Sequence, residues 1–220
     1  MAKDKIKGIS KAHTVYKLAD GKTRVPGTTT ITGLLNKPYL VKWANNLGLE
    51  GIDSSKYTDE AAAVGTLAHA MVQAHLQKDE LDMNQFSKVQ IDLAENALIS
   101  FFEWKSRHEI LPIACEMPMV SEALRYGGTI DCYCMLDGKP TLLDFKTGKA
   151  IYEEYFVQLA AYKNLLEEQG HPVEQCRILR IGRDETEGFE ERTVTDTRRY
   201  FDIFEHLLCV YYLKKELGWK

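Results

Sequence analysis

The chain has 220 residues, 45% of them hydrophobic, and a formal net charge of −4 at pH 7. This length allows one substantial hydrophobic core and is most simply met by a single domain. The sequence contains no repeat, no low-complexity tract and no apolar run long enough to cross a membrane. The stretch Met1 to Lys7 lacks the apolar core of a secretion signal, so we expect a cytoplasmic protein without a membrane partner. Because the chain is acidic on average, binding to nucleic acid would require a locally basic or metal-containing site.

Turn signals and hydrophobic periodicity predict the elements of the first half of the chain. A small β hairpin is expected over about residues 14–30, with its turn at residues 19–22. A short helix is then predicted at about 38–46, a second at about 58–77 and a long one at about 82–105. These segments precede the residues that carry the most chemistry.

The second half is predicted to contain five strands and two helices. Three strands are expected over about 111–145, including the β-rich runs 113–120, 126–135 and 141–145. A helix at about 152–169, ended by Gly170, leads to strands at 176–181 and 188–194 and a final helix at 197–215. This order predicts an α/β sandwich with a central mixed β-sheet flanked by helices.

The hairpin at residues 126–145 places two carboxylates together. Asp137-Gly138 separates its two β-rich runs, and Asp-Gly in that setting is a strong hairpin signal. Asp131 on the first strand and Asp144 on the second then come level across the pair. Lys146 lies two residues beyond Asp144, so the alternation of a strand turns both to the same side. The sequence therefore predicts two carboxylates and one ammonium group at a single spot.

Such a group suits the hydrolysis of a phosphodiester. Carboxylate pairs repel each other unless a cation is bound, and hard oxygen ligands with open positions favour Mg²⁺ or Mn²⁺. Lys146 would orient or deprotonate the attacking nucleophile. For any one residue alone, an ordinary role is the better interpretation: Asp131 in a turn or strand, and Asp144 with Lys146 as an exposed ion pair. Their combination favours the catalytic interpretation.

Four sequence blocks carry a family resemblance. They are Gly65-Thr66-Leu67-Ala68-His69-Ala70, Gly127-Gly128-Thr129-Ile130-Asp131, Leu142-Leu143-Asp144-Phe145-Lys146-Thr147-Gly148 and Gln158 with Tyr162. Together they resemble the PD-(D/E)xK nucleases, in particular the RecB-like branch. The segment from Arg24 to Leu35 is similar to the opening of phage-type and mitochondrial exonucleases of this superfamily. The resemblance covers about residues 12–185.

The resemblance implies a restriction-endonuclease-like fold and a set of site residues. It implies a catalytic core at about 109–195, preceded by a hairpin and helices at about 1–108 and followed by the C-terminal helix. It implies that metal is bound by His69, Asp131, Asp144 and the Phe145 carbonyl, and that Lys146 is catalytic together with the two aspartates. Gln158 and Tyr162 would support the site and contact nucleic acid; their spacing puts them on one helix face. The alternatives are a buried structural histidine at 69, a surface glutamine and a half-buried tyrosine.

Further polar residues receive weaker predictions. Glu116 precedes the hairpin at a place where relatives carry a glutamate, although a solvated strand position explains it at least as well. His75 lies six residues after His69, too far round the helix to share its face, and is expected to be structural or exposed. Six arginines follow the catalytic helix, and ordinary surface charge explains most of them. Arg183 is the one we expect to bind substrate. The six are Arg177, Arg180, Arg183, Arg192, Arg198 and Arg199.

Five cysteines do not predict a metal site. Cys132 and Cys134 share a strand face, but the chain lacks the paired Cys-x-x-Cys motifs typical of zinc sites. Some RecB-like relatives hold an iron–sulfur cluster through one N-terminal and three C-terminal cysteines, and this chain does not follow that pattern. We therefore expect no cluster and a reducing compartment.

Two classes of function remain open. The first is a Mg²⁺- or Mn²⁺-dependent DNA exonuclease that acts on single strands or duplex ends in phage or bacterial recombination, repair or processing, working in a bacterial or phage-infected cell. The second is a noncatalytic nuclease-fold protein that binds DNA or a partner. The complete set of His69, Asp131, Asp144 and Lys146 favours the first. An endonuclease is the second choice among enzymes, because no helix-turn-helix or zinc finger is recognisable. A homo-oligomer or a recombination partner is compatible with either class.

Overall fold

The computed structural model describes residues 7–8 and 14–219. Residues 1–6, which supplied most of the argument about a targeting signal, lie outside the described residues, as do 9–13 and 220. The elements in chain order are β1 (Lys7–Gly8), β2 (Tyr16–Lys17), β3 (Arg24–Val25), α1 (Thr28–Thr32), α2 (Pro38–Leu49), α3 (Ser54–Gln77), β4 (Leu81–Asp82), α4 (Lys88–Lys105), β5 (Ile110–Ser121), β6 (Tyr126–Leu136), β7 (Lys139–Lys146), α5 (Glu154–Glu168), β8 (Gln175–Ile181), β9 (Phe189–Val194) and α6 (Arg198–Glu216).

A five-stranded mixed sheet forms the centre of the molecule. Its strand order is β5-β6-β7-β8-β9. Strands β7 and β8 are parallel, and the other neighbouring pairs are antiparallel. The parallel pair is joined through α5, as a crossover connection requires. The predicted fold class, a mixed sheet flanked by helices, is confirmed.

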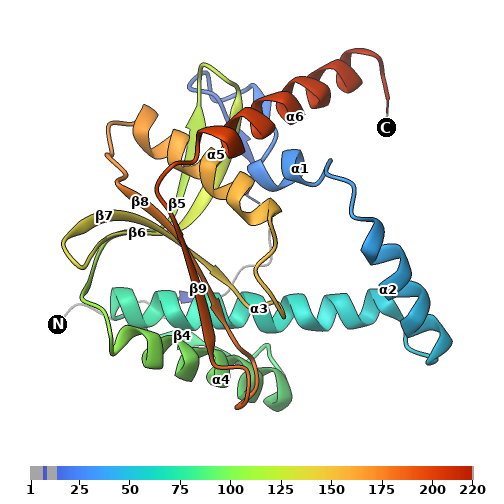
Figure 1. Ribbon diagram of the computed structural model, residues 1–220, viewed down its shortest axis with the longest axis vertical. Helices are drawn as coiled ribbons and strands as arrows, with labels where there is room; N and C mark the ends of the chain where they lie inside the picture. The colour runs from blue at the N-terminus through green and yellow to red at the C-terminus, as the bar shows by residue number, and fades with distance from the viewer. Residues whose placement is uncertain (1–6, 9–13, 220) are drawn as a thin grey trace.

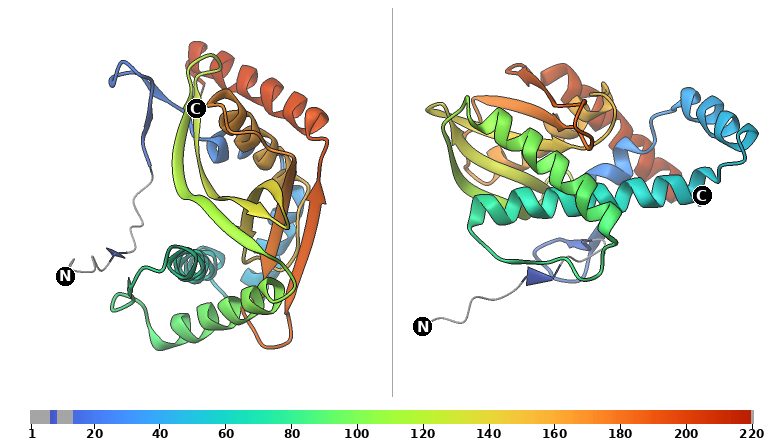
Figure 2. Two further views of the ribbon diagram at one scale, coloured as in Figure 1. Left: turned by 90° about the vertical axis from the view of Figure 1, so that its left-hand side faces the viewer. Right: turned by 90° about the horizontal axis from the view of Figure 1, so that it is seen from below.

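Helices cover both faces of this sheet (Figures 1 and 2). On one face α1, α5 and α6 enclose a core that includes Ile31, Leu159 and Phe204. On the other face α3 and α4 enclose a second core around Phe101, Trp104 and Leu143. Helix α2 stands apart from both layers, between α1 and α3 in the chain (Figure 1). Among the described residues, no helix combines the length and the apolar character that a membrane span needs.

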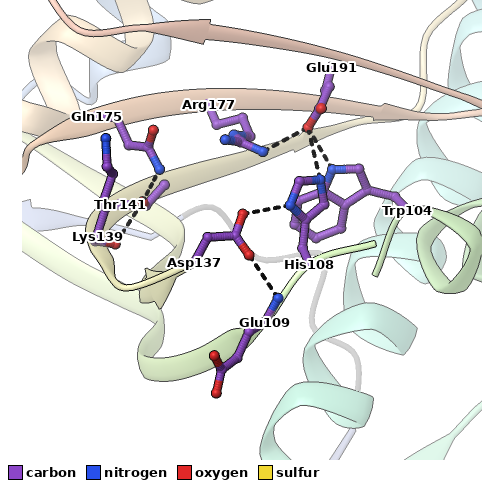
Figure 3. Close-up of polar contacts among 9 residues, drawn as sticks. All are labelled: Trp104, His108, Glu109, Asp137, Lys139, Thr141, Gln175, Arg177 and Glu191. Atoms are coloured by element: carbon purple, nitrogen blue, oxygen red, sulfur yellow. Dashed lines mark hydrogen bonds and ion pairs between the residues drawn. The ribbon is translucent and has the colours of Figure 1, made fainter. Parts of the chain in front are cut away.

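The β6–β7 turn has the geometry that its sequence predicts. Asp137 and Gly138 have φ angles of 51° and 79°, the two positive values that a type I′ turn requires. Asp137 Oδ1 accepts a hydrogen bond from the Glu109 amide at 2.9 Å, and Oδ2 lies 2.7 Å from His108 Nδ1 (Figure 3). The turn is thereby tied to the segment between α4 and β5.

Helix α5 ends where the sequence predicts. Gly170 has a φ of 82°, and its amide donates to the Glu167 carbonyl at 3.0 Å. The following amide, of His171, donates to the Leu166 carbonyl at 2.9 Å. These two bonds form a Schellman motif, which satisfies carbonyl groups at the helix end.

Two predicted boundaries differ most from the structure. Helix α4 begins at Lys88 rather than near residue 82, because Ser87 and Gln90 form a capping box that starts the helix there. The preceding Leu81–Asp82 instead forms β4, which pairs with β1. The N-terminal hairpin is shorter than expected, because residues 28–32 turn into helix α1. Burial of Ile31 in the core outweighs the strand preference of the neighbouring threonines.

Candidate active site and metal centre

The candidate site lies where strands β6 and β7 diverge. Their pairing ends at Cys132 and Leu143, whereas β7 stays paired with β8 to its last residue. Asp131 and Asp144 are the next residues in that register, so they face each other at the opening of the fork. The Phe145 amide donates a hydrogen bond to Asp131 Oδ2 at 2.7 Å. The hairpin therefore brings the two carboxylates together, as the sequence predicts.

Asp144 is a buried carboxylate with little compensation. The residue is 1% exposed, and among the described residues its oxygens have no donor besides the Lys146 ammonium. Lys146 Nζ forms an ion pair with Oδ2 at 2.5 Å. Burial raises the pKa of Asp144 to about 6, although Lys146 opposes the shift. Unsatisfied buried oxygens are costly, and a bound cation would satisfy them. These residues therefore fit a divalent metal ion.

Three potential ligand atoms gather around Asp131, the partner of this carboxylate across the fork. His69 Nδ1 is 3.6 Å from Asp131 Oδ2. One ligand atom each of His69, Glu116 and Asp131 can be chosen so that all three lie within 4.8 Å of one another. Glu116 comes opposite Asp131, because the residues on either side of it pair in that register. It is exposed and has a φ of 51°, which is uncommon for a glutamate. The structure thus gives Glu116 a more central place than the sequence did.

The electrostatics of Asp131 differ from those of Asp144. Burial alone would raise the pKa of Asp131, but His69, Lys146 and the Phe145 amide together outweigh it, and the net shift is downward. For His69, burial alone would lower the pKa, and the Asp131 carboxylate reverses the direction. Asp131 therefore has partners of its own, whereas Asp144 has only the lysine. Of the two carboxylates at the fork, Asp144 is therefore the one whose negative charge is less well compensated.

Two glycine positions explain how the surrounding elements approach the fork. A Cβ at Gly65 of α3 would come 2.8 Å from Thr147 Oγ1, so glycine lets the helix reach the end of β7. One turn later, that helix presents His69. A Cβ at Gly128 would come 2.5 Å from the Tyr162 ring, so glycine there lets α5 lie close against β6. Both glycines belong to the sequence blocks that predicted the site.

Gln158 and Tyr162 lie on one face of α5 and contact each other. Gln158 Nε2 donates to the Tyr162 hydroxyl at 2.8 Å. Tyr162 is only 5% exposed, and burial, with the Asp144 carboxylate as a further cause, raises its pKa well above the usual range. Its hydroxyl is therefore close enough to interact electrostatically with Asp144, while its ring packs against Gly128. Gln158 is partly exposed.

Arg183 lies away from the metal-ligand group. Its guanidinium donates to the Ala61 carbonyl at 3.5 Å, and it lines a cavity of about 450 Å³ between α3, α4 and the β8–β9 loop. The remaining five arginines form ion pairs with acidic side chains, and two of them, Arg177 and Arg180, are largely buried rather than on the surface. Their partners are Glu191 for Arg177, Glu190 for Arg180 and Arg192, Asp196 for Arg198 and Asp202 for Arg199.

The aromatic surroundings of Lys146 were not predicted from the sequence. Its ammonium lies 4.9 Å from the centre of the Tyr155 ring, a distance typical of a cation–π contact. Tyr152 packs edge-on against Tyr155. The signal was two tyrosines within the nine residues that follow the lysine.

Comparison with known proteins gives distant structural likenesses. No family model and no curated protein matches the chain. The fold is similar to that of an alkaline exonuclease (LHK-Exo) from Laribacter hongkongensis, with a TM-score of 0.46 and 9% identity over 87% of this chain and 88% of that one. It is also similar to that of a candidate exonuclease from Eubacterium rectale, with a TM-score of 0.42 and 16% identity over 90% and 76% of the two chains. These likenesses are too distant to assign an activity to this chain.

Proposed function

We propose that this protein is a metal-dependent nuclease that hydrolyses the phosphodiester bonds of DNA. The observation that carries the proposal is the buried Asp144 carboxylate, which lies opposite Asp131 and whose only donor among the described residues is the Lys146 ammonium on Oδ2. A site that only stabilised the fold would gain nothing from leaving the other oxygen, Oδ1, unsatisfied. A cation that also binds a phosphate would explain both the unsatisfied oxygen and the neighbouring lysine.

The metal would be held by oxygen and nitrogen ligands of four elements. The ligands we propose are His69, Asp131, Asp144 and the Phe145 carbonyl, and Glu116 joins them on the strength of its position. A set dominated by carboxylates suits Mg²⁺ or Mn²⁺. The bound ion would stabilise the charge that develops on the phosphodiester during hydrolysis.

The protein's own groups would position substrate and nucleophile. Lys146 keeps N–H groups beyond its Asp144 ion pair and can donate them to a phosphate oxygen or to the attacking water. Asp131 is held in place by the Phe145 amide and by His69. Gln158 is partly exposed and can reach the nucleic acid, and its hydrogen bond to the Tyr162 hydroxyl holds its side chain in position. We retain Arg183 as a more distant substrate contact.

We further propose that the enzyme is an exonuclease. The supporting argument is that the sequence shows no recognisable sequence-reading module of the kind a site-specific endonuclease usually needs. A role in bacterial or phage DNA recombination, repair or processing belongs to the same proposal. Single strands and duplex ends are the expected substrates.

The test is cleavage of end-labelled single-stranded, blunt duplex and closed circular DNA with Mg²⁺, Mn²⁺ or EDTA. Lys146→Ala should lower turnover on the order of 10²-fold, because a group that acts on developing charge is lost. Lys139→Ala is the matched control, since it removes an exposed lysine at the hairpin tip, which pairs with Glu174. Metal-dependent loss of linear DNA with circles spared would support an exonuclease.

The other outcomes separate the alternatives. Cut circles would show an endonuclease. DNA binding without cleavage by any metal would overturn the catalytic proposal and favour a noncatalytic binding protein. Equal turnover with weaker binding in Lys146→Ala would make the lysine a phosphate contact rather than a catalytic group.

A further inference from the structure

A row of aromatic rings leads from the candidate site to helix α2. The Lys146 ammonium lies over Tyr155, whose ring centre is 5.6 Å from that of Tyr152. Tyr152 in turn faces Tyr39 of α2 with centres 6.0 Å apart and an interplanar angle of 11°. We call Tyr39, Tyr152 and Tyr155 the aromatic row. It begins at the lysine that would contact the phosphate and ends at a helix outside the two core layers.

The outer part of the aromatic row is open to solvent. Tyr39 is 47% exposed and Tyr152 is 37% exposed. None of the twelve residues of α2, all of which the structure describes, is buried. Tyr39 and Tyr152 therefore contribute little to either core, although large aromatic side chains usually stabilise a protein by being buried. Their exposure beside a substrate site is better explained by a ligand that covers them.

Lys37, beside the aromatic row, is already paired with an acidic side chain. Lys37 Nζ forms an ion pair with Glu154 at 2.8 Å, and the Tyr39 hydroxyl donates to the same carboxylate at 3.4 Å. A phosphate would therefore have to compete with Glu154 for this lysine. The flat aromatic rings instead match the faces of nucleobases. Stacking of a base on an aromatic side chain tolerates any sequence, because every base has a π face.

We propose that the aromatic row is a stacking surface for unpaired nucleobases, so that the strand bound at the site is single-stranded. The inference rests on the proposed nuclease function and deepens it by naming the substrate class. In a duplex, neighbouring base pairs cover the faces of the bases, so a base could stack on the row only at a frayed end. An unpaired strand with its phosphate at Lys146 can place the adjoining bases along the row. The row therefore favours single-stranded over duplex nucleic acid.

The test is the binding of a labelled oligothymidylate, of the same strand with abasic sites, and of a blunt duplex. Fluorescence anisotropy in EDTA measures binding without cleavage. Tyr39→Ala and Tyr152→Ala should each weaken oligothymidylate binding roughly 5- to 100-fold, the range expected for one lost stacking partner. Binding of the abasic strand and the duplex should change little. The slope of affinity against salt should be unchanged, because no phosphate contact is removed.

Matched variants separate stacking from a structural role. Tyr39→Phe and Tyr152→Phe keep the rings and should keep wild-type affinity. Phe102→Ala removes a ring of α4 that is 40% exposed and should not affect binding. Circular dichroism would show that each variant is folded.

Three results would overturn the inference: wild-type affinity in both alanine variants, an equal loss for all three ligands, or failure of phenylalanine to restore binding. An equal loss would show that the rings only dock α2. If base-dependent binding holds but no metal supports cleavage, the nuclease proposal fails and the stacking surface stands. If the protein cleaves DNA but its binding does not depend on the bases, the stacking proposal fails and the nuclease proposal stands.

Discussion

At the scale of single residues, Asp144 distinguishes this site from a structural ion pair. Asp144→Asn keeps the shape of the side chain and removes its charge, so a metal ligand is lost without a cavity. We expect cleavage to fall on the order of 10²-fold or more, the scale expected when stabilisation of developing charge is lost. The unfolding midpoint without metal should stay within about 4 °C, a shift that corresponds to about 1 kcal/mol. Turnover and thermal unfolding measured together check this.

The control for that variant is Asp92→Asn, which neutralises an exposed aspartate of α4. It should leave turnover unchanged. Full activity in Asp144→Asn would refute the assignment of the site. A collapse of stability would instead show that the carboxylate serves mainly to hold Lys146.

His75 makes a separate prediction, about pH and stability. Lys105 Nζ donates to His75 Nε2 at 2.7 Å, which requires a neutral imidazole. Burial, and then the Lys105 charge, lower the pKa of His75 below its ordinary 6.5. The unfolded chain therefore takes up a proton at a higher pH than the folded chain does. The neutral His75 therefore contributes stability that is fully present above pH 6.5, and this contribution is lost as the pH falls through the lower pKa of the folded protein.

The measurement is the unfolding midpoint of wild type and His75→Gln from about pH 8 to about pH 5. Glutamine can accept the same hydrogen bond and does not titrate, so the variant should lose less stability on acidification. His206→Gln, at an exposed position of α6, should behave like wild type. Identical pH profiles for wild type and His75→Gln would contradict the prediction.

At the scale of elements, the contact between β6 and α5 depends on Gly128. In Gly128→Ala the new methyl group would meet the Tyr162 ring at 2.5 Å, so a strand or the helix has to shift. We expect a loss of about 1–3 kcal/mol, as is typical of overpacking in a core. Chemical denaturation gives the free energy of unfolding directly.

Gly48→Ala is the counterpart of this change. Gly48 lies within α2, and a Cβ there would meet nothing within 4 Å. Alanine in a helix interior should stabilise by roughly 0.5–1 kcal/mol. Equal effects of the two substitutions on the free energy of unfolding would show that the close contact between Gly128 and Tyr162 does not require a glycine.

At the scale of the whole molecule, the proposed metal centre joins α3, β5, β6 and β7. Binding to the folded state alone raises stability by mass action, by about 2.7 kcal/mol at 100 times the dissociation constant. For a chain of this size that is a rise in unfolding midpoint of roughly 5–10 °C. Thermal unfolding with added Mn²⁺ should show the rise in wild type and in Asp92→Asn, and EDTA should reverse it.

Asp131→Asn should abolish most of this rise, because Asp131 belongs to both the carboxylate pair and the group with His69 and Glu116. An equal rise in Asp131→Asn and wild type would place the stabilising ion elsewhere on the protein. This test does not depend on cleavage, so it examines the metal site separately from the activity.

Local sequence was sufficient to predict the order of the main elements and the register of the central hairpin. Asp137-Gly138 specifies a two-residue turn, and the turn places Asp131 opposite Asp144 whatever surrounds them. Gly170 ended α5 for an equally local reason. Boundaries that depended on side chains several residues away were less predictable. The start of α4 required the reciprocal hydrogen bonds of Ser87 and Gln90 to be recognised.

Only the tertiary structure decided which distant groups meet at the fork. Packing of α3 against the end of β7 brings His69 within 3.6 Å of Asp131 across 62 positions of sequence. Packing also turned most of the arginines toward acidic partners and left the Asp144 carboxylate with Lys146 as its only donor among the described residues. The physical reason is that periodicity and turn chemistry act over a few residues. Burial and distances between side chains depend on how the layers close around the sheet.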